Sequence, residues 1–155
     1  MVKIIQEIPI SSAPIGLLMI ADPSESRIRS YLPMSKCFTI SAGDEILGAC
    51  VVRPNGDGSH ELMSIAVLPA HQNSGLGTVL LKWVIEHFRA IGATELLVGT
   101  GTFGYQLAFY QRQGFRVATI ERDYFIKNYP EPIFENGIQL FDMLILKLVY
   151  RDPFS

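Results

Sequence analysis

The chain has 155 residues, with 13 Lys and Arg against 15 Asp and Glu and a formal net charge of −2. A chain of this length is expected to fold as one domain, residues 1–155, and to bury roughly two thirds of the surface that it exposes when unfolded. The charge argues against a non-specific nucleic-acid binder, which needs a basic face. No apolar run is long enough for a transmembrane helix, so we expect no membrane partner.

The two cysteines, Cys37 and Cys50, both lie in apolar stretches. Neither belongs to a C-x-x-C or Cys/His spacing of the kind that holds a metal. We therefore expect two reduced thiols that pack in the core as small apolar groups. This cysteine usage favours a cytoplasmic protein without a structural metal.

The spacing of apolar residues predicts alternating strands and helices along the chain. The expected strands are residues 2–8, 37–41, 45–53, 61–68, 95–98, 115–122 and 143–150. The expected helices are residues 22–32, 75–91 and 105–113. Gly92 stands where a left-handed cap ends the longest helix, and Asn136-Gly137 is a type I′ hairpin signal. This order predicts an α/β or α+β fold with a mixed sheet.

A glycine-containing loop opens the longest predicted helix. Its residues are Gln72, Asn73, Ser74, Gly75, Leu76, Gly77 and Thr78. Backbone N–H groups at a helix start point outward and carry partial positive charge, so they can hold a pyrophosphate without a lysine. The two glycines allow close approach of the backbone, and the hydroxyls of Ser74 and Thr78 add possible donors. A plain strand-to-helix turn is the alternative.

A second loop, residues 99–104, reads Gly-Thr-Gly-Thr-Phe-Gly and matches the G-x-G-x-x-G pattern of dinucleotide-binding folds. Glu121 or Asp123 follows about 20 residues later, where such folds place a ribose-binding acid. Too few residues follow Gly104 for the remaining strand–helix units of such a fold. We expect a flexible strand exit beside a ligand, with a small dinucleotide-dependent oxidoreductase as the less favoured alternative.

Two stretches resemble the signatures of the GNAT family of N-acetyltransferases. Residues 65–81 begin Ile-Ala-Val-Leu-Pro and continue Gln-Asn-Ser-Gly-Leu-Gly into an apolar helix, similar to the family pattern I-A-V-x-P followed by Q/R-x-x-G-x-G/A. Residues 108–115, Ala-Phe-Tyr-Gln-Arg-Gln-Gly-Phe, resemble the pattern A-x-x-Y-x-x-x-G-F and are one residue shorter between Ala and Tyr. The family usually has Asn shortly before this Ala, and residues 102–106 contain none.

The resemblance implies a single-domain GNAT fold, in which a mixed, mostly antiparallel twisted sheet splays between its central strands and is flanked by helices. It also implies acetyl-CoA as the cosubstrate, bound without a metal where residues 61–68 diverge from residues 95–99. Unpaired backbone groups at such a splay can bind the pantetheine arm like a short extra strand. The residues assigned to the cosubstrate are Ile65, Ala66 and Val67 on the strand, Gln72 to Thr78 in the loop, and Thr102.

Acetyl transfer to an amine needs a base for the ammonium proton, a donor for the thioester carbonyl and an acid for the leaving thiolate. The resemblance implies that Tyr110 is the acid and Glu61 the base. A core tyrosine and a solvated carboxylate are the alternatives. His60 is a further base candidate, but adjacent strand residues face opposite ways. His60 and Glu61 can therefore share one site only if a bulge intervenes.

Residues 121–142 carry five acidic against two basic residues, with four aromatic residues before Asn136. Acids interleaved with aromatic rings suit a cationic amine, through ion pairs and cation–π contacts. The candidate substrate-binding residues are Asp123, Tyr124, Tyr129, Glu131 and Glu135. A solvated hairpin and a homodimer surface are the alternatives for this segment.

The sequence is thus interpreted as an acetyl-CoA-dependent N-acetyltransferase. It resembles a subset of bacterial GNAT proteins and, more loosely, the aminoglycoside-modifying ones. The expected reaction moves the acetyl group to a primary amine of a small cationic molecule, by direct attack in a ternary complex. The alternative from another class is a catalytically inactive acyl-CoA-binding sensor or interaction module.

Overall fold

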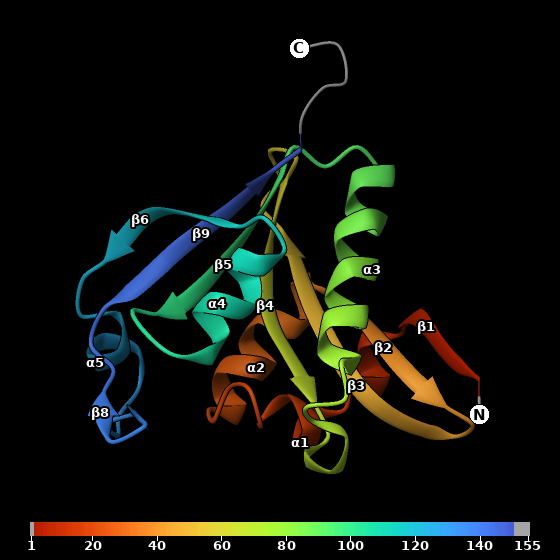
Figure 1. Cartoon of the computed structure of the whole chain (residues 1–155), viewed down its shortest axis with the longest axis horizontal. Helices are drawn as coiled ribbons and strands as arrows, with labels where there is room; N and C mark the ends of the chain where they lie inside the picture. The colour runs from red at the N-terminus through yellow and green to blue at the C-terminus, as the bar shows by residue number, and fades with distance from the viewer. Residues whose placement is uncertain (1, 151–155) are drawn as a thin grey trace. The chain divides into compact units, whose positions relative to one another are not determined.

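A computed structural model of the chain describes residues 2–150 and divides into two compact units, Met1–Thr94 and Glu95–Ser155, called unit 1 and unit 2 (Figure 1). The elements of unit 1 are β1 (Lys3–Ile8), η1 (Ile10–Ser12), α1 (Ile15–Leu18), α2 (Glu25–Tyr31), η2 (Leu32–Met34), β2 (Lys36–Ala42), β3 (Glu45–Pro54), β4 (Ser59–Val67), η3 (Pro69–His71) and α3 (Leu76–Ala90). The elements of unit 2 are β5 (Glu95–Gly101), α4 (Tyr105–Arg112), β6 (Arg116–Glu121), α5 (Tyr124–Asn128), β7 (Phe134–Glu135), β8 (Ile138–Gln139) and β9 (Met143–Val149).

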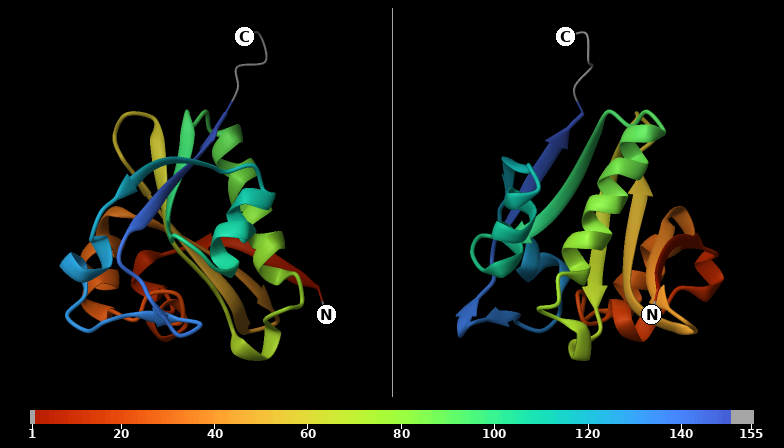
Figure 2. Two further views of the ribbon diagram at one scale, coloured as in Figure 1. Left: turned by 60° about the vertical axis from the view of Figure 1, so that its left-hand side comes forward. Right: turned by 45° about the vertical axis from the view of Figure 1, so that its right-hand side comes forward.

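Unit 1 is an antiparallel sheet, ordered β1-β2-β3-β4, with helices on both faces. Adjacent residues of β2 point to opposite faces of the sheet, because side chains alternate along a strand. The ring of Phe38 packs against Phe88 and Trp83 of α3, with centroids 5.7 and 5.6 Å apart. Cys37 points the other way, into a cluster with residues of α1 and α2. The views in Figure 2 agree that α3 lies along one face of these strands.

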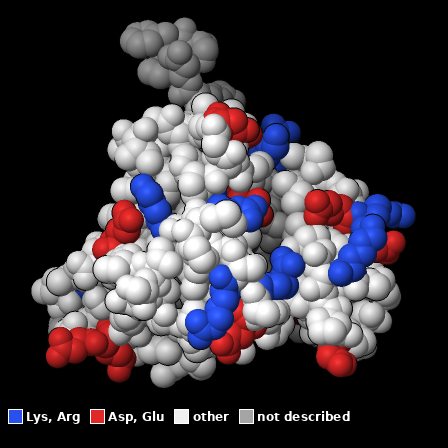
Figure 3. Space-filling view, turned by 180° about the vertical axis from the view of Figure 1, so that it is seen from behind, with Lys and Arg blue, Asp and Glu red and all other residues white. Residues whose placement is uncertain are grey.

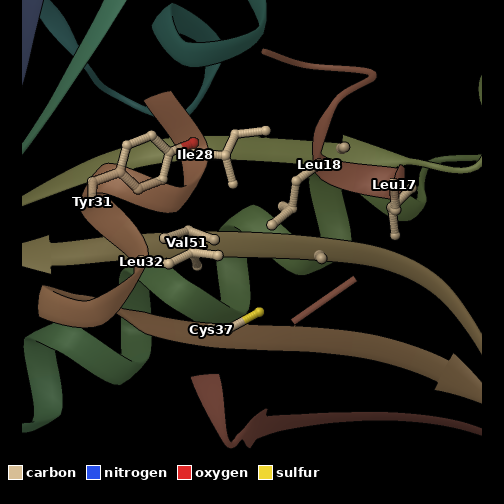
Figure 4. Packing of buried hydrophobic residues seen from close by; sticks show 9 residues of the cluster. Leu17, Leu18, Ile28, Tyr31, Leu32, Cys37 and Val51 are labelled. Carbon is tan, nitrogen blue, oxygen red and sulfur yellow. The ribbon is translucent and has the colours of Figure 1, made fainter. Parts of the chain in front are cut away.

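The cluster between the sheet and the first two helices is apolar and closely packed (Figure 4). Leu18 and Ile28 are fully buried there against Val51 of β3. Burying a side chain of this size stabilises the fold by roughly 1.5–3 kcal/mol. The cluster fixes α1 and α2 on the sheet face that carries Ala66 of β4.

A β-bulge interrupts the pairing of β3 with β4. Val51 pairs with Ser64, but the next residue, Val52, pairs with Leu62, so Met63 is the extra residue on β4. A bulge bends its strand and re-aims the side chains that follow it. The bulge lies between Glu61 and the segment of β4 that leads into the glycine-containing loop.

In unit 2, strand β9 lies between β5 and β6 and pairs antiparallel with both. Leu146 of β9 is fully buried, and Phe109 and Tyr110 of α4 are also part of the core. The small hairpin β7–β8 turns at Asn136 and Gly137, whose φ angles of 52° and 78° are those of a type I′ turn. The hairpin predicted from Asn136-Gly137 is therefore confirmed.

Most predicted elements are confirmed to within a few residues, and the start of the helix expected at residues 22–32 is corrected. The second helix begins with Ser24 as its cap, because the Ser24 hydroxyl accepts a hydrogen bond from Arg27 N–H at 3.3 Å, whereas Asp22 accepts one from Ser24 N–H. The short helix α5 was not predicted. None of the helices in residues 2–150 is long and apolar enough to cross a membrane.

Candidate active site

Two residues of the glycine-containing loop adopt the left-handed backbone conformation. Gly75 caps α3 in the left-handed conformation, with φ 84° and ψ 0°, and Asn73 also has a positive φ of 63°. The first hydrogen bond of the helix runs from Val79 N–H to Gly75 O, at 3.0 Å. The N–H groups of Leu76, Gly77 and Thr78 precede this bond, as the first donors of any α-helix do. They are therefore available to an anionic ligand.

Two side chains of the loop bind its own backbone. The Gln72 amide Nε2 donates to Val67 O at 3.1 Å, which connects the loop to the end of β4. The Ser74 hydroxyl donates to His71 O. This proton of Ser74 is used within the loop, so the backbone amides are left as the main donors. Gln72, Asn73, Ser74 and Gly75 are exposed, whereas Leu76 is buried and anchors the start of α3.

The strand residues expected to bind the cosubstrate lie at the end of β4. Ile65, Ala66 and Val67 pair with Cys50, Ala49 and Gly48 of β3. Gly48 leaves little room here, since an added Cβ would lie 3.1 Å from Ala66 O. Ala66 belongs to the apolar cluster that contains α1 and α2. Alternate backbone groups of β4 are thus used by β3, and the others point to the opposite edge of the strand.

Glu61 and His60 face opposite sides of the sheet in unit 1. The Glu61 carboxylate forms an ion pair with Arg53, its register partner on β3, with Nη2 and Oε1 3.3 Å apart. The His60 ring packs on Phe88 of α3, with centroids 4.6 Å apart. The bulge comes two residues after Glu61, so it does not bring the two side chains to one face. Only one of them can serve a given site.

The environment of His60 disfavours its protonated form. Burial lowers the pKa of this imidazole below its usual value, and the nearby positive charge of Lys36 acts in the same direction. Its Nδ1 atom is buried, and no hydrogen-bond partner for it occurs among the residues that the structure describes. His60 is therefore a half-buried residue whose ring packs on α3.

Tyr110 is buried in unit 2, where its side chain is only 4% exposed. Its ring meets Phe109 and Phe115 edge-on, with centroids 5.2 and 5.6 Å apart. Its backbone carbonyl accepts hydrogen bonds from Gln113 N–H and Phe115 N–H, which end helix α4 and hold the tyrosine in place. The tyrosine therefore has a packing role of its own, whatever its part in catalysis.

The second glycine loop is explained by packing within unit 2. Gly99 and Gly101 belong to strand β5, and a Cβ at Gly99 would collide with the Met143 sulfur. A Cβ at Gly101 would lie 2.9 Å from Leu140. The glycines thus allow β5 to pack closely against the C-terminal part of the chain, and the G-x-G-x-x-G match needs no dinucleotide. Thr102, the cofactor candidate of this loop, is exposed.

The acidic residues between positions 121 and 142 differ in their contacts and in their exposure. Asp142 is engaged, since its Oδ1 accepts a hydrogen bond from Asp123 N–H at 2.8 Å and its Oδ2 lies 3.8 Å from Arg122. Glu135 is half-buried against the start of α4, where a Cβ at Gly104 would lie 2.5 Å from Oε1. Asp123 and Glu131 are exposed.

The aromatic residues of this segment form a local stack. The Phe125 ring lies 5.4 Å from that of Tyr124 and 6.1 Å from that of Tyr129. Tyr124 and Tyr129 thus flank one phenylalanine and are only half-buried. The structure thus brings these two candidates together with Phe125.

Sequence reasoning missed Arg53 as a neighbour of Glu61. The two are eight positions apart, and only the register of β3 with β4 makes them partners. In the space-filling view of Figure 3, basic and acidic side chains are interspersed over the visible face. Within residues 2–150, no cluster of three or more His, Cys, Asp or Glu could hold a metal ion.

Comparisons with known proteins agree with this geometry. A sequence model described as the acetyltransferase (GNAT) family matches residues 10–115. The uncharacterized N-acetyltransferase YvbK of Bacillus subtilis (strain 168) is 41% identical over 133 residues, which cover 85% of this chain and 86% of that protein.

Solved structures are similar over nearly the whole chain. A GNAT family acetyltransferase from Elizabethkingia anophelis, solved with acetyl-CoA bound, is 37% identical and has a TM-score of 0.91, over 96% of this chain and 98% of that one. An IAA acetyltransferase from Bacillus cereus ATCC 14579 gives the same identity and TM-score, over 96% of this chain and 100% of the other. The predicted fold, a mostly antiparallel sheet with flanking helices, is thereby confirmed.

Proposed function

Because this chain belongs to the GNAT family of acetyltransferases, we propose that it transfers the acetyl group of acetyl-CoA to a primary amine of a small cationic molecule. Acetyl-CoA, which is bound in the relative from Elizabethkingia anophelis, is the cosubstrate, and the proposed reaction uses no metal. The observation that carries the proposal is the loop at the start of α3, whose N–H donors precede the first helical hydrogen bond. We further propose that both units form one catalytic domain, since the family match spans residues of both.

The proposed cosubstrate contacts are made chiefly by backbone. The amides of Leu76, Gly77 and Thr78 carry the partial positive charge of the helix start and would bind the pyrophosphate. Asn73, Ser74 and Gly75 shape the turn, and Gln72 holds it to β4. Backbone groups of Ile65, Ala66 and Val67 that β3 does not use would pair with the amides of pantetheine. This accounts for polyanion binding by a chain whose net charge is −2.

The proposed reaction is direct attack within a ternary complex. The amine nitrogen first gives up a proton, because an alkylammonium group has a pKa near 10.4 and its charged form has no lone pair. The nitrogen then attacks the thioester carbonyl carbon, whose oxygen becomes negative and is stabilised by a backbone N–H of β4. The carbon–sulfur bond breaks and the CoA thiolate leaves and takes up a proton, while the nitrogen, which is positively charged after the attack, loses its second proton and becomes the neutral amide.

Two side chains are assigned to the proton transfers. Tyr110 is the proposed acid for the thiolate. Glu61 is the proposed base, acting directly or through one water, and His60 is set aside because it packs on Phe88 instead. The ion pair with Arg53 would orient the Glu61 carboxylate.

The acceptor is proposed to bind at Asp123, Tyr124, Tyr129, Glu131 and Glu135. The carboxylates of Asp123 and Glu131 are exposed, that of Glu135 is half-buried, and together with the half-buried aromatic rings they would offer a cation both ion pairs and ring faces. Asp142 is not assigned to the acceptor, because Arg122 and Asp123 N–H already occupy its carboxylate. The acceptor's Michaelis constant should rise with salt, since ion pairs at the surface are screened over about 8–10 Å near physiological ionic strength.

The function is tested by a turnover screen. Purified protein is mixed with acetyl-CoA and a panel of polyamines, aminoglycosides, simple amines and peptides, and CoA thiol release and acetylated product are both measured. We expect turnover with small cationic amines. Binding of acetyl-CoA without turnover on any amine would instead identify a sensor module. In a thermal-shift assay, a ligand at 100 times its Kd adds about 2.7 kcal/mol of stability, which we expect with acetyl-CoA and not with NADH.

The acceptor assignment is tested by neutralising charges in matched sets. The triple variant Asp123→Asn, Glu131→Gln, Glu135→Gln should raise the Michaelis constant for the amine and leave acetyl-CoA affinity unchanged. The control is Glu25→Gln, Asp44→Asn, Glu86→Gln, which removes the same charge from exposed positions of unit 1. Equal kinetics for the two triple variants would place the acceptor elsewhere.

A further inference from the structure

Strand β6 presents an uncovered edge. It pairs with β9 along one side (Figure 1), and all six of its residues, Arg116 to Glu121, are exposed. Val117 is 48% and Ile120 is 55% exposed. An edge strand with unpaired N–H and C=O groups is a template for another strand, and proteins usually protect it with charge, proline, a β-bulge or a covering element. Among the residues that the structure describes, no such element lies over this strand.

A bulge at Ala118 decides which side chains of β6 share a face. Val117 pairs with Leu146 of β9 and Thr119 pairs with Ile145, so Ala118 is the extra residue. In a regular strand, Val117 and Ile120 would point to opposite faces, since they are three positions apart. Their partners Leu146 and Leu144 are two positions apart on β9, which places Val117 and Ile120 on one face.

The same bulge places the two charged ends of β6 on the other face. Arg116 pairs with Lys147, and Glu121 pairs with Met143. These partners are four positions apart on β9, so Arg116 and Glu121 point to the same side. Lys147 already lies 3.7 Å from Glu95. In the described part of the chain, neither Arg116 nor Glu121 takes part in an ion pair.

We propose that β6 pairs with β6 of a second copy of this chain, antiparallel and about a two-fold axis between Ala118 and Thr119. In this register, Arg116 lies opposite Glu121 of the other copy, and Val117 lies opposite Ile120. Each pair occurs twice by symmetry. Side chains directly opposite each other in an antiparallel pair share a face. Because of the bulge, the two members of each pair do point to the same face of the sheet. The small residues Ala118 and Thr119 meet at the centre.

Charge complementarity selects a second copy over an unrelated strand. The sequence Arg-Val-Ala-Thr-Ile-Glu has a base and an acid at opposite ends and apolar residues at the matching inner positions, so it complements its own reverse. A contact of one strand from each copy is small, since stable interfaces bury about 1,200–2,000 Å² in total. The dimer is therefore expected to be weak and concentration-dependent.

A charge exchange tests the register. The molar mass of the full chain is measured by analytical ultracentrifugation over a concentration series, at low and high salt. We expect a monomer–dimer equilibrium that weakens with salt. Arg116→Glu and Glu121→Arg should each raise the dimer dissociation constant by on the order of tenfold, because each sets like charges opposite one another twice. The double variant, which exchanges the two charges, should restore dimerisation.

Cross-linking gives a second readout that does not depend on the strength of the dimer. Val117→Cys with Ile120→Cys should form a disulfide-linked dimer under mild oxidation, since the two positions face each other across the axis. Either single variant should not, and the native Cys37 and Cys50 are buried. Val117→Lys should abolish the dimer, whereas Ile91→Lys, an equally exposed apolar position at the end of α3, should not.

The proposal is overturned by a protein that is monomeric throughout the concentration series and does not cross-link. It is equally overturned by a dimer whose dissociation constant is unaffected by Arg116→Glu and Val117→Lys, because that dimer would use another surface. The proposed register would be excluded if the charge-exchanged double variant did not dimerise although its circular dichroism spectrum was normal. None of these results depends on whether the protein acetylates amines.

Discussion

Arg53 and Glu61 form an ion pair across β3 and β4, with 3.3 Å between Nη2 of the arginine and Oε1 of the glutamate. They are also register partners, so the contact is set by the pairing of the two strands. Their side chains are 32% and 27% exposed, which leaves the carboxylate open to water on one side. The proposed base is thus both anchored and accessible.

Glu61→Gln should lower kcat while leaving acetyl-CoA affinity nearly unchanged, because the amide cannot accept the proton of the amine. The free energy of unfolding should fall by no more than about 1 kcal/mol, as for other partly exposed ion pairs. Glu86→Gln is the control, since it also removes a carboxylate that is paired with an arginine, at 3.2 Å. Steady-state kinetics and urea unfolding measure both effects, and equal kcat values in the two variants would exclude Glu61 as the base.

Gly77→Val should weaken CoA binding without unfolding the protein. Gly77 lies inside α3, where valine has a helix propensity at least equal to that of glycine, and the added carbons would obstruct the pyrophosphate. Gly75 is a poorer test position, because its φ of 84° strains any larger side chain. Isothermal titration gives the Kd, with Val79→Ala, an exposed change in the same turn, as the control. Normal CoA affinity in Gly77→Val would move the pyrophosphate away from this loop.

Tyr110→Phe should reduce kcat by on the order of 100- to 10,000-fold if the hydroxyl is the acid for the leaving thiolate. Because the ring is buried between Phe109 and Phe115, phenylalanine keeps the packing and the acetyl-CoA affinity. The alkaline limb of the pH–rate profile should flatten or move in the variant. Tyr105→Phe, an exposed change on the same helix, is the control. A chemistry-limited rate that is unchanged in Tyr110→Phe would leave the tyrosine with its packing role alone.

The protein should lose stability in mild acid through His60. Burial lowers the pKa of His60 in the folded chain, so the unfolded chain, where a histidine has a pKa of about 6.5, binds the proton more readily. The free energy of unfolding therefore falls as the pH drops below about 6.5, until the folded-state pKa is passed. His60→Gln should flatten this dependence and His71→Gln should not. Urea unfolding midpoints between pH 5 and 8 measure this pH dependence. The same dependence in the wild-type protein and in His60→Gln would refute the assignment to His60.

Local patterns in the sequence were enough to predict the longest helix, the loop before it and the Asn136-Gly137 hairpin. Helix periodicity, the caps at Gly75 and Gly92, and a turn that requires positive φ at both central residues are properties of a few neighbouring residues. The two family signatures are also local, which is why the resemblance they carried was confirmed. The assignment of single residues to the site remains a prediction.

Only the tertiary structure determined which residues are partners across strands and to which face of the sheet each side chain points. The pairing of Arg53 with Glu61 and the extra residues Met63 and Ala118 follow from strand alignments that the spacing of apolar residues does not encode. The glycine pair of β5 illustrates the same limit. Its spacing matched a phosphate-binding motif, but the glycines are required because Met143 and Leu140, some forty residues later in the chain, pack against them. A one-residue change of register turns every following side chain to the other face, so only the folded chain determines which residues meet.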